Sequence, residues 1–332
     1  MIYEKIKQFI KNNYKIILVY IFIICIFTIN LPYYISAPGG LLDTKDKVKT
    51  EEEFRLSGSL NMAYVTEIHA TIPTFLWSFA NRDWDLKKQE DVTAGNESIK
   101  DMEIRNKLLL AESNDFAELV AYKYSNIDYD IENDKVYVCF IDSASKTDLK
   151  IGDQILEVDG VKIVDKSHLL SYIASKNVGD QVIFKVLSNG KEKKRVASLI
   201  DVKGSPKVGA MIAENFDITS DKNIKFTFSD SESGSSGGLM LTLTIYGNLN
   251  RIDLTSGKKI VGTGTIDING NVGEISGVKY KLIGAVKNKA DVFLVPEGDN
   301  YKEAKRVKKE KGYDIDIVPV ETFEEALRYL TK

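Results

Sequence analysis

The sequence predicts a multi-domain protein with an N-terminal transmembrane helix, a small mostly-β domain and a C-terminal α/β domain. Three observations predict this architecture. A long uncharged stretch follows the basic start of the chain, strand-like segments joined by turns fill its middle, and strand-like and helical segments alternate over its last third. The 332 residues suffice for two domains and one further element. The expected segments are a basic cytoplasmic tail (1–15), a transmembrane anchor (16–36), a juxtamembrane region of strands and a helix (43–125), the mostly-β domain (126–203) and the α/β domain (206–332).

The charge and the residue composition limit the chemistry of the chain. Lys and Arg total 45 and Asp and Glu total 48, so the positive surface of a nucleic-acid-binding protein is missing and we expect no nucleic-acid partner. Two cysteines and two histidines at no metal-ligand spacing predict no metal site, and we expect no cofactor. His69 and His168 have no evident triad partners, so we expect surface or packing roles for them.

The start of the chain predicts a membrane anchor. Residues 16–42 contain no charge, and roughly 20 apolar residues are needed to cross the hydrocarbon core as a helix. Four lysines and one glutamate precede this stretch, so the positive-inside rule places the N-terminus in the cytoplasm and the later domains outside the cell membrane. A cleaved signal peptide is the alternative. Residues 33–38 offer no small-x-small cleavage site free of an adjoining proline, which favours an uncleaved, single-pass anchor in the lipid.

The juxtamembrane region gives two weaker signals. Residues 73–79 (PTFLWSF) are conspicuously aromatic and either rest on the lipid interface or pack on the next domain. We expect packing. Residues 107–122 have apolar positions at helical spacing and predict a helix.

The mostly-β domain contains a recognisable signature. Strand-like runs lie at 136–141 and 154–158, and a short helix is predicted at 167–175. The stretch 149–160 (LKIGDQILEVDG) resembles the signature of bacterial PDZ domains, and the helix and a hairpin at Asn189-Gly190 follow in that family's order.

The PDZ resemblance implies a peptide-binding groove. Such a domain takes up an extended peptide as an added strand beside a helix. We therefore expect peptide binding at the first strand, together with the groove face of the helix at 167–175, and the residues concerned are Tyr137, Val138, Cys139, Phe140 and Ile141. The alternative is a PDZ-like module that serves only as a spacer.

A loop rich in glycine and serine interrupts the α/β domain at 231–238 (SESGSSGG). Such a composition is typical of linkers, but this one lies between two apolar runs inside a domain. Glycines around a serine leave backbone N–H groups free near a helix start, where they can stabilise an oxyanion. The alternation over 239–245 that follows predicts a strand.

A serine nucleophile needs a base that takes its proton. Because neither histidine is convincing, we expect a lysine held neutral by burial in apolar surroundings. Lys279 and Lys281 lie two residues apart on a predicted helix, so at most one of them can be buried beside the serine.

Residues 230–295 resemble the proteolytic domain of the Lon family. The family's D-G-P-S-A-G motif matches 233–238, which implies that Ser236 is the nucleophile. Its G-G-hydrophobic-x-x-K run matches 276–281, which implies that Lys281 is the base.

The same resemblance assigns supporting roles. The family's T-G-E/T-I segment matches 263–266, so Thr263 is expected to support the lysine amine. The resemblance also implies a helix at 238–249 in place of the strand, and backbone N–H groups around Ser235 to Gly237 as an oxyanion hole. In the motif, Ser235 replaces the proline and Gly237 the alanine, two changes that loosen the loop.

The order of anchor, PDZ-like unit and Lon-like unit is similar to that of the membrane-anchored, PDZ-containing Lon-like serine proteases of Gram-positive bacteria (the YlbL/SepM type). This resemblance implies a serine endopeptidase with a Ser-Lys dyad that cleaves peptides or unfolded proteins outside the cytoplasm. It also implies a homo-oligomer. The sequence contains no Walker motif, so we expect activity without ATP. The alternative is a membrane-tethered peptide-binding scaffold with an inactive Lon-like domain.

Overall fold

The computed structural model describes residues 2–51, 53–94 and 97–332, which form two compact units. The first unit consists of Met1–Pro38 and Val65–Val92, and the second of Gly39–Tyr64 and Thr93–Lys332. Two strands, β1 (Tyr33–Asp43) and β3 (Ser59–His69), contribute residues to both units. The first unit also holds α1 (Ile2–Thr28), α2 (Ile72–Ala80), β4 (Asp85–Lys88) and α3 (Gln89–Val92).

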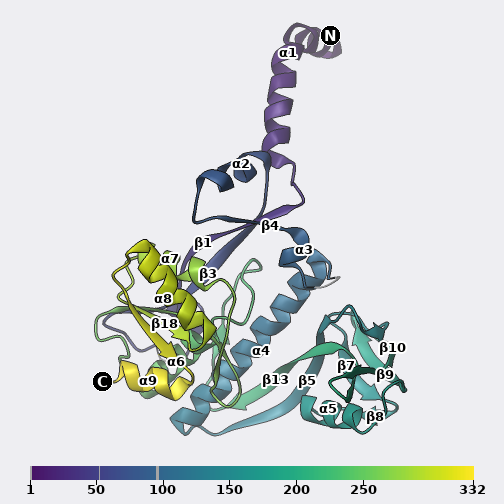
Figure 1. Cartoon of the computed structure of the whole chain (residues 1–332), viewed down its shortest axis with the longest axis vertical. Helices are drawn as coiled ribbons and strands as arrows, with labels where there is room; N and C mark the ends of the chain where they lie inside the picture. The colour runs from purple at the N-terminus through teal and green to yellow at the C-terminus, as the bar shows by residue number, and fades with distance from the viewer. Residues whose placement is uncertain (1, 52, 95–96) are drawn as a thin grey trace. The chain divides into compact units, whose positions relative to one another are not determined.

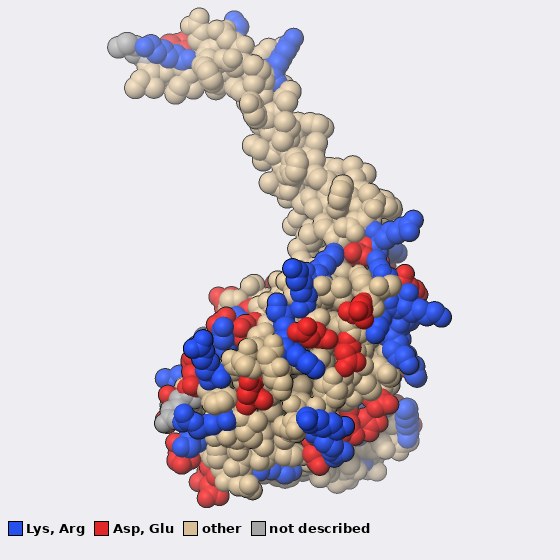
Figure 2. All heavy atoms as spheres, turned by 90° about the vertical axis from the view of Figure 1, so that its left-hand side faces the viewer, with Lys and Arg blue, Asp and Glu red and all other residues tan. Residues whose placement is uncertain are grey.

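Helix α1 is long and apolar enough to cross a membrane, and none of its residues is buried. It ends at Thr28, whereas the predicted anchor continues to residue 36, where the chain is already in β1. Pro32 disfavours a helical conformation before it, which explains the early end. A helix needs about 20 residues to cross the hydrocarbon core, so a span that ends at Thr28 would begin near residue 9 and include Lys11 and Lys15. The basic start of α1 and its uncharged remainder are visible in Figure 2.

The aromatic segment of the juxtamembrane region forms α2, and our expectation that it packs is wrong for three of its side chains. Leu76, Trp77 and Phe79 are 63%, 59% and 71% exposed. Phe75 lies one turn from Phe79, with their ring centres 5.2 Å apart, and its ring centre is 5.4 Å from that of Tyr33. The ring of Phe75 therefore has a partner elsewhere in the first unit.

The second unit contains an α/β sheet whose strands run in the order β19-β18-β15-β3-β1 (Figure 1). Strands β3, β15, β18 and β19 are parallel. Helices α7 and α8 pack on one face of the sheet and α4, α6 and α9 on the other, each over its own apolar cluster. The bounds are β15 (Lys259–Gly262), β18 (Val292–Pro296), β19 (Asp316–Val320), α4 (Ile99–Ser125), α6 (Gly238–Asn250), α7 (Val278–Lys287), α8 (Asp299–Lys311) and α9 (Phe323–Leu330).

This sheet extends beyond the predicted α/β domain of 206–332. Strand β3 lies beside β15, and Leu60 and Met62 enter the same apolar cluster as α6. Helix α4 adds Ala117 and Val120 to that cluster. Part of the expected juxtamembrane region is thus integral to the α/β core.

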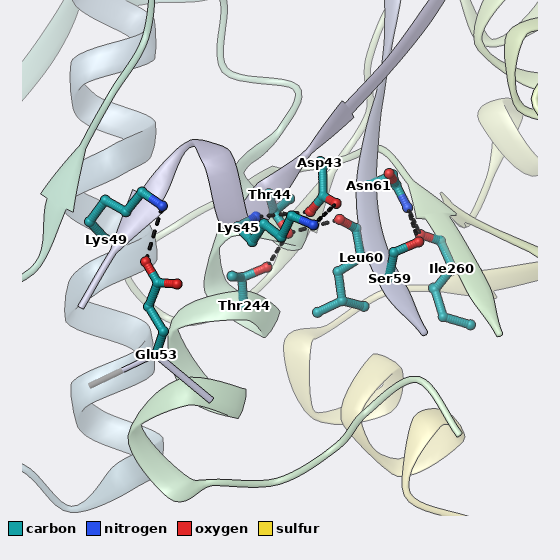
Figure 3. Close-up of polar contacts among 10 residues, drawn as sticks. All are labelled: Asp43, Thr44, Lys45, Lys49, Glu53, Ser59, Leu60, Asn61, Thr244 and Ile260. Carbon is teal, nitrogen blue, oxygen red and sulfur yellow. Dashed lines mark hydrogen bonds and ion pairs between the residues drawn. The ribbon is translucent and has the colours of Figure 1, made fainter. Parts of the chain in front are cut away.

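The residues after the glycine-serine loop form a helix, as the Lon resemblance implied, and not the strand that the alternation predicted. Every residue from Gly238 to Ile245 is buried, so α6 has no polar face and no helical periodicity that a pattern could reveal. A contact between two threonine hydroxyls, one in α6 and one in the short helix η1 (Thr44–Asp46), joins these two elements. Oγ1 of Thr244 lies 2.6 Å from Oγ1 of Thr44, whose hydroxyl donates to the carbonyl of Leu60 (Figure 3).

A second sheet in this unit follows the order β13-β5-β7-β9-β10-β6, with β8 paired to β7. The expected hairpin joins β9 and β10, and Asn189 and Gly190 both have positive φ, as a type I′ turn requires. The bounds are β5 (Tyr129–Ile141), β6 (Lys146–Thr147), β7 (Gln154–Val158), β8 (Val161–Lys162), α5 (Lys166–Ala174), β9 (Gln181–Ser188), β10 (Lys191–Ser198) and β13 (Ala210–Ser220).

Short elements complete the structure. They are η1 (Thr44–Asp46), β2 (Val48–Lys49), β11 (Ile200–Val202), β12 (Ser205–Lys207), β14 (Lys225–Phe226), β16 (Thr265–Ile266) and β17 (Val272–Gly273).

Candidate active site

Three segments of the α/β domain meet at the carboxyl end of β15. Thr263 directly follows this strand, and its N–H donates to the carbonyl of Leu294 in β18 at 3.1 Å. Ser236 lies in the turn that opens α6, and Lys281 lies in the first turn of α7. Because α6 and α7 cover opposite faces of the sheet, their first turns reach one another only at its edge. The carboxyl end of parallel strands is where open α/β sheets place their sites.

The three polar side chains are in direct contact. Nζ of Lys281 lies 2.7 Å from Oγ of Ser236 and 2.9 Å from Oγ1 of Thr263. The hydroxyl of Thr263 donates to the carbonyl oxygen of Ser236 at 3.1 Å. Lys281 and Thr263 are buried, and Ser236 is half-buried, so the serine is the member of the group that remains open to solvent.

These contacts fix the direction of the Thr263 proton. Because Thr263 gives its proton to the carbonyl of Ser236, its oxygen can only accept, and it accepts from an N–H of Lys281. A neutral amine carries two N–H groups and one lone pair, so rotation about the Cε–Nζ bond can turn either an N–H or the lone pair toward Oγ of Ser236, 2.7 Å away. With the lone pair in that direction, the lysine can accept the serine proton.

Burial holds the lysine near neutrality. The side chain of Lys281 lies 3% exposed, and desolvation alone lowers its pKa from 10.5 to about 7. Within the described part of the chain no carboxylate forms an ion pair with it. Lys281 can accordingly exchange a proton at physiological pH, which an exposed lysine does not do.

The backbone of the serine loop is held through its carbonyl groups. The carbonyl of Ser236 accepts from the N–H of Gly264 at 2.8 Å, and that of Ser235 accepts from the hydroxyl of Ser113 at 3.1 Å. Among the described residues, the N–H groups of Ser236 and Gly237 have no hydrogen-bond partner. In a trans peptide the N–H points away from the carbonyl, so both N–H groups point away from these anchors. Two free N–H groups at a helix start are suited to an oxyanion.

The structure explains one departure from the Lon motif. A Cβ at position 237 would overlap the sulfur of Met62, which is 5% exposed and part of the core. Met62 therefore fills the volume that an alanine methyl would take. Gly237 thus packs directly against Met62, and this contact offsets the loosening of the serine loop that we expected from the glycine.

Other candidate residues lie away from the contact group. Lys279 is half-buried, with Nζ 5.3 Å from the ring centre of Tyr280. His69 lies in the first unit, where Nε2 is 2.5 Å from the hydroxyl of Tyr34. His168 lies in α5 of the β domain, and its Nδ1 is buried without a partner.

The expected peptide-binding residues Tyr137, Val138, Cys139, Phe140 and Ile141 are not at a free edge, and this prediction is wrong. They lie in β5, which pairs with β13 on one side and with β7 on the other. The β13 side of β5 is paired as far as Ile141, and on the other side Tyr137 pairs with β7 and Val138 bonds Gly152 and Asp153, so no further strand can add along this segment.

The edge of this sheet is β13 instead, a strand that the sequence analysis missed because it follows the recognised signature. Its outward N–H groups meet carboxylates of α4. The N–H of Glu214 donates to Glu112 at 2.9 Å, and that of Phe216 donates to Asp115 at 2.8 Å. Helix α4 therefore covers part of the edge that a peptide would extend.

Comparisons with known families agree with this division of the chain. The model of the PDZ domain matches residues 123–198, and that of the Lon protease (S16) C-terminal proteolytic domain matches residues 227–332. The chain thus combines a PDZ domain with a Lon-type C-terminal proteolytic domain. The multi-domain architecture expected from the sequence, with an apolar N-terminal helix, a PDZ domain and a Lon-type proteolytic domain, is confirmed.

Similar proteins include Lon proteases of two bacteria. The Lon protease of Campylobacter jejuni is 28% identical over 192 residues, which are 54% of this chain and 22% of that protein. The Lon protease of Neorickettsia sennetsu is 31% identical over 99 residues, which are 30% of this chain and 12% of that protein. The chain thus matches less than a quarter of the length of each of these relatives.

Similar solved structures include PDZ domains of SdrC-like proteins. The domain from Listeria innocua is 33% identical and covers 24% of this chain and 92% of its own, with a TM-score of 0.23. The domain from Listeria monocytogenes is 30% identical and covers 25% of this chain and 92% of its own, with a TM-score of 0.24.

The contact of Thr263 with the lysine leads to a first prediction. The change Thr263→Val keeps the shape of the side chain but removes the hydroxyl that orients the amine. We expect kcat/KM for a peptide substrate to fall by about 10- to 100-fold, the effect of one buried hydrogen bond. Thr255, 1% exposed and hydrogen-bonded to Asp253 and Gly58, is a matched control. Equal losses in Thr263→Val and Thr255→Val would mean that the effect is one of stability alone.

Proposed function

We propose that the chain is an ATP-independent serine endopeptidase in which neutral Lys281 takes the proton of Ser236. The observation that carries this proposal is the 2.7 Å contact between the serine hydroxyl and a lysine whose pKa burial lowers to about 7. The motif resemblance selects the same serine, which lies within the residues that match the Lon-type domain.

The geometry supports acyl transfer in two steps. Lys281 accepts the proton as Oγ of Ser236 attacks the carbonyl carbon of the peptide bond, and the N–H groups of Ser236 and Gly237 stabilise the resulting oxyanion. The lysine then protonates the leaving amine, which breaks the C–N bond and leaves an acyl-serine. Water gives a proton to the neutral lysine and attacks this ester, and return of that proton to Oγ releases the carboxylic acid and restores Ser236.

Substrates are flexible polypeptides on the extracytoplasmic side of the membrane in this proposal. In this proposal the site takes a polypeptide that is already extended. Helix α1 anchors the protein in the lipid, and its lysines place the N-terminus in the cytoplasm. Assembly into a homo-oligomer stays a prediction of the family resemblance.

Docking of the substrate by the PDZ domain is part of the same proposal. We assign it to the β13 edge in place of Tyr137 to Ile141, because β13 is the strand at the end of the sheet beside α5. Glu112 and Asp115 occupy two of its N–H groups, so a peptide that pairs along the whole strand has to displace α4.

The test is cleavage of an unfolded protein by the full chain in lipid nanodiscs, without nucleotide. Reduced, alkylated casein is a suitable substrate, and mass spectrometry identifies the products. We expect cleavage by the wild type and by Ser235→Ala, which removes the neighbouring hydroxyl, and none by Ser236→Ala. Cleavage that persists in Ser236→Ala would contradict the assigned nucleophile. A wild type that binds casein without cleaving it would support the inactive scaffold.

A further inference from the structure

Helix α4 touches the serine loop at two points, although the motif contains no residue of this helix. The hydroxyl of Ser113 donates to the carbonyl of Ser235 at 3.1 Å, and the carbonyl of Asn106 accepts from the N–H of Gly234 at 3.0 Å. Asn106 and Ser113 are seven residues apart and therefore lie on one face of the helix, two turns from each other. One face of α4 thus lies along the loop that carries the nucleophile.

The position of Ser113 is closely fitted to that loop. Ser113 is 2% exposed, and a Cβ at Gly238 would come within 2.8 Å of its hydroxyl oxygen. The first residue of α6 is therefore a glycine that lets α4 approach. This close approach allows a side chain far away in the sequence to hold the backbone next to Ser236.

The bond from Ser113 acts on the peptide that joins Ser235 to Ser236. This peptide is planar, so a fixed carbonyl of Ser235 also fixes the direction of the N–H of Ser236. The carbonyl receives one further bond, from the N–H of Gly238 at 3.2 Å, which is longer and lies within the same turn. Ser113 is the external anchor that keeps this plane from rotating.

We propose that Ser113 is a positioning residue that aims the N–H of Ser236 at the oxyanion of the reaction. The proposal rests on the proposed peptidase function and adds to it a residue outside the Lon-type domain match. Ser113 does not touch the substrate or Lys281. Its loss should therefore weaken stabilisation of the transition state and leave substrate binding and the titration of the lysine unchanged.

The experiment compares Ser113→Ala with Ser125→Ala in the full chain. Ser125 is a matched control because it also lies on α4 and bonds α6, but at the far end, where it accepts from the side chain of Asn250 at 2.7 Å. For Ser113→Ala we expect kcat to fall by about 10- to 100-fold, less than the loss of a whole oxyanion donor. We expect KM within about twofold of wild type and an unchanged pH midpoint. Ser125→Ala should keep wild-type kcat.

A second measurement separates positioning from packing. A peptidyl boronate forms a tetrahedral adduct with the serine, whereas a product peptide does not. Ser113→Ala should lower the affinity for the boronate and leave the affinity for the product peptide unchanged. Wild-type kcat in Ser113→Ala, or equal losses in both variants, would overturn the inference while the peptidase proposal stands. Absence of cleavage by the wild type would overturn both.

A different observation carries a second inference, on the first unit. Three large apolar side chains of α2, those of Leu76, Trp77 and Phe79, are exposed, and the helix contains no charged residue. Helices α1 and α2 are in contact within this unit. Exposed aromatic side chains next to a helix that can span a membrane suit the lipid interface, which tryptophan prefers. We infer that the exposed side chains of α2 insert into the outer leaflet of the lipid surface that holds α1.

The two tryptophans of the chain allow a direct test. Trp77 is exposed on α2, whereas Trp84 is half-buried against Ile35 and Ala37. The variants Trp84→Phe and Trp77→Phe each leave one reporter, and both are placed in phosphatidylcholine vesicles with bromine on the acyl chains. We expect the bromolipid to quench emission of Trp77 by about half or more and that of Trp84 much less.

The outcomes are distinguishable. Protein that floats with the vesicles while Trp77 stays unquenched would overturn insertion of α2, and a partner protein would then be the better candidate to cover its exposed side chains. Protein that fails to float would overturn the anchor and the inference together.

Discussion

Replacing Lys281 by methionine should abolish peptide hydrolysis while it makes the folded chain more stable at neutral pH. Methionine fills a similar volume but cannot accept the proton of Ser236. We expect kcat to fall by at least about 10³-fold, as for the loss of a base in related dyads and triads. A substitution that inactivates an enzyme and stabilises it is the signature of a strained, buried catalytic group.

The stability effect follows from the lowered pKa of Lys281. Between pH 7 and 10.5 the unfolded lysine holds a proton and the folded lysine does not, so stability of the wild type rises with pH through this window. Below pH 7 the lysine is protonated in both states, and burying its charge then lowers the stability of the folded chain by at most about 5 kcal/mol, at 1.36 kcal/mol per pKa unit. Lys281→Met also loses the hydrogen bonds to Ser236 and Thr263, which reduces this gain in stability by about 1–3 kcal/mol. We expect a net gain of about 2 kcal/mol at pH 7.

Urea unfolding of the detergent-solubilised chain at pH 7 and pH 9.5 measures this effect. The gain from Lys281→Met should shrink as the pH rises, because the unfolded wild type then loses its proton. Lys279→Met is the matched control, since Lys279 is half-buried on the same helix and outside the contact group. It should remain active. A less stable Lys281→Met chain at pH 7 would show that the lysine is not buried at a cost.

The second large effect is a loss of activity in acid. Only neutral Lys281 can accept the serine proton, so kcat/KM should fall tenfold per unit below its pKa of about 7. Between pH 8 and pH 5 this amounts to about a 100-fold loss. A pH profile of the cleavage of a short peptide measures it, and a flat profile between pH 5 and 8 would contradict the neutral-lysine mechanism.

Carboxyl groups on α4 titrate in the same range and need a control. Burial raises the pKa of Glu118 to about 7 and that of Asp115 to about 6. Glu118→Gln removes the first of these groups without touching Ser236 or Lys281. We expect its pH midpoint to match that of the wild type. A midpoint that disappears in Glu118→Gln would assign the acid loss to α4.

The candidate site was accessible from the sequence because short motifs carry it. Ser236, Thr263 and Lys281 were selected by their places in three motifs, and the structure places Nζ of Lys281 within 3 Å of both hydroxyl oxygens. Composition alone left Ser235 and Lys279 open as alternatives. Only the family motifs selected Ser236 over Ser235 and Lys281 over Lys279, because serines are common in loops and lysines are common on helices.

The fold was harder to predict wherever tertiary contacts override local pattern. Residues 238–245 of α6 are all buried, so their sequence shows neither a polar face nor a helical period. Strand β3 joins the sheet beside β15 across about 200 positions of the chain, a pairing without a local signal. The peptide-binding strand was misplaced for the same reason, because β13 covers β5 from beyond the PDZ signature.

Trapping the acyl-enzyme tests the central claim most directly. The full chain is mixed with an activated peptidyl ester, quenched in acid within the first turnover, and digested for mapping by mass spectrometry. We predict a single acyl group on Ser236 in the wild type and none in Ser236→Ala, with acylation slowed by at least about 10³-fold in Lys281→Met. An acyl group on Ser235, or equal acylation in Lys281→Met, would contradict the Ser236–Lys281 dyad.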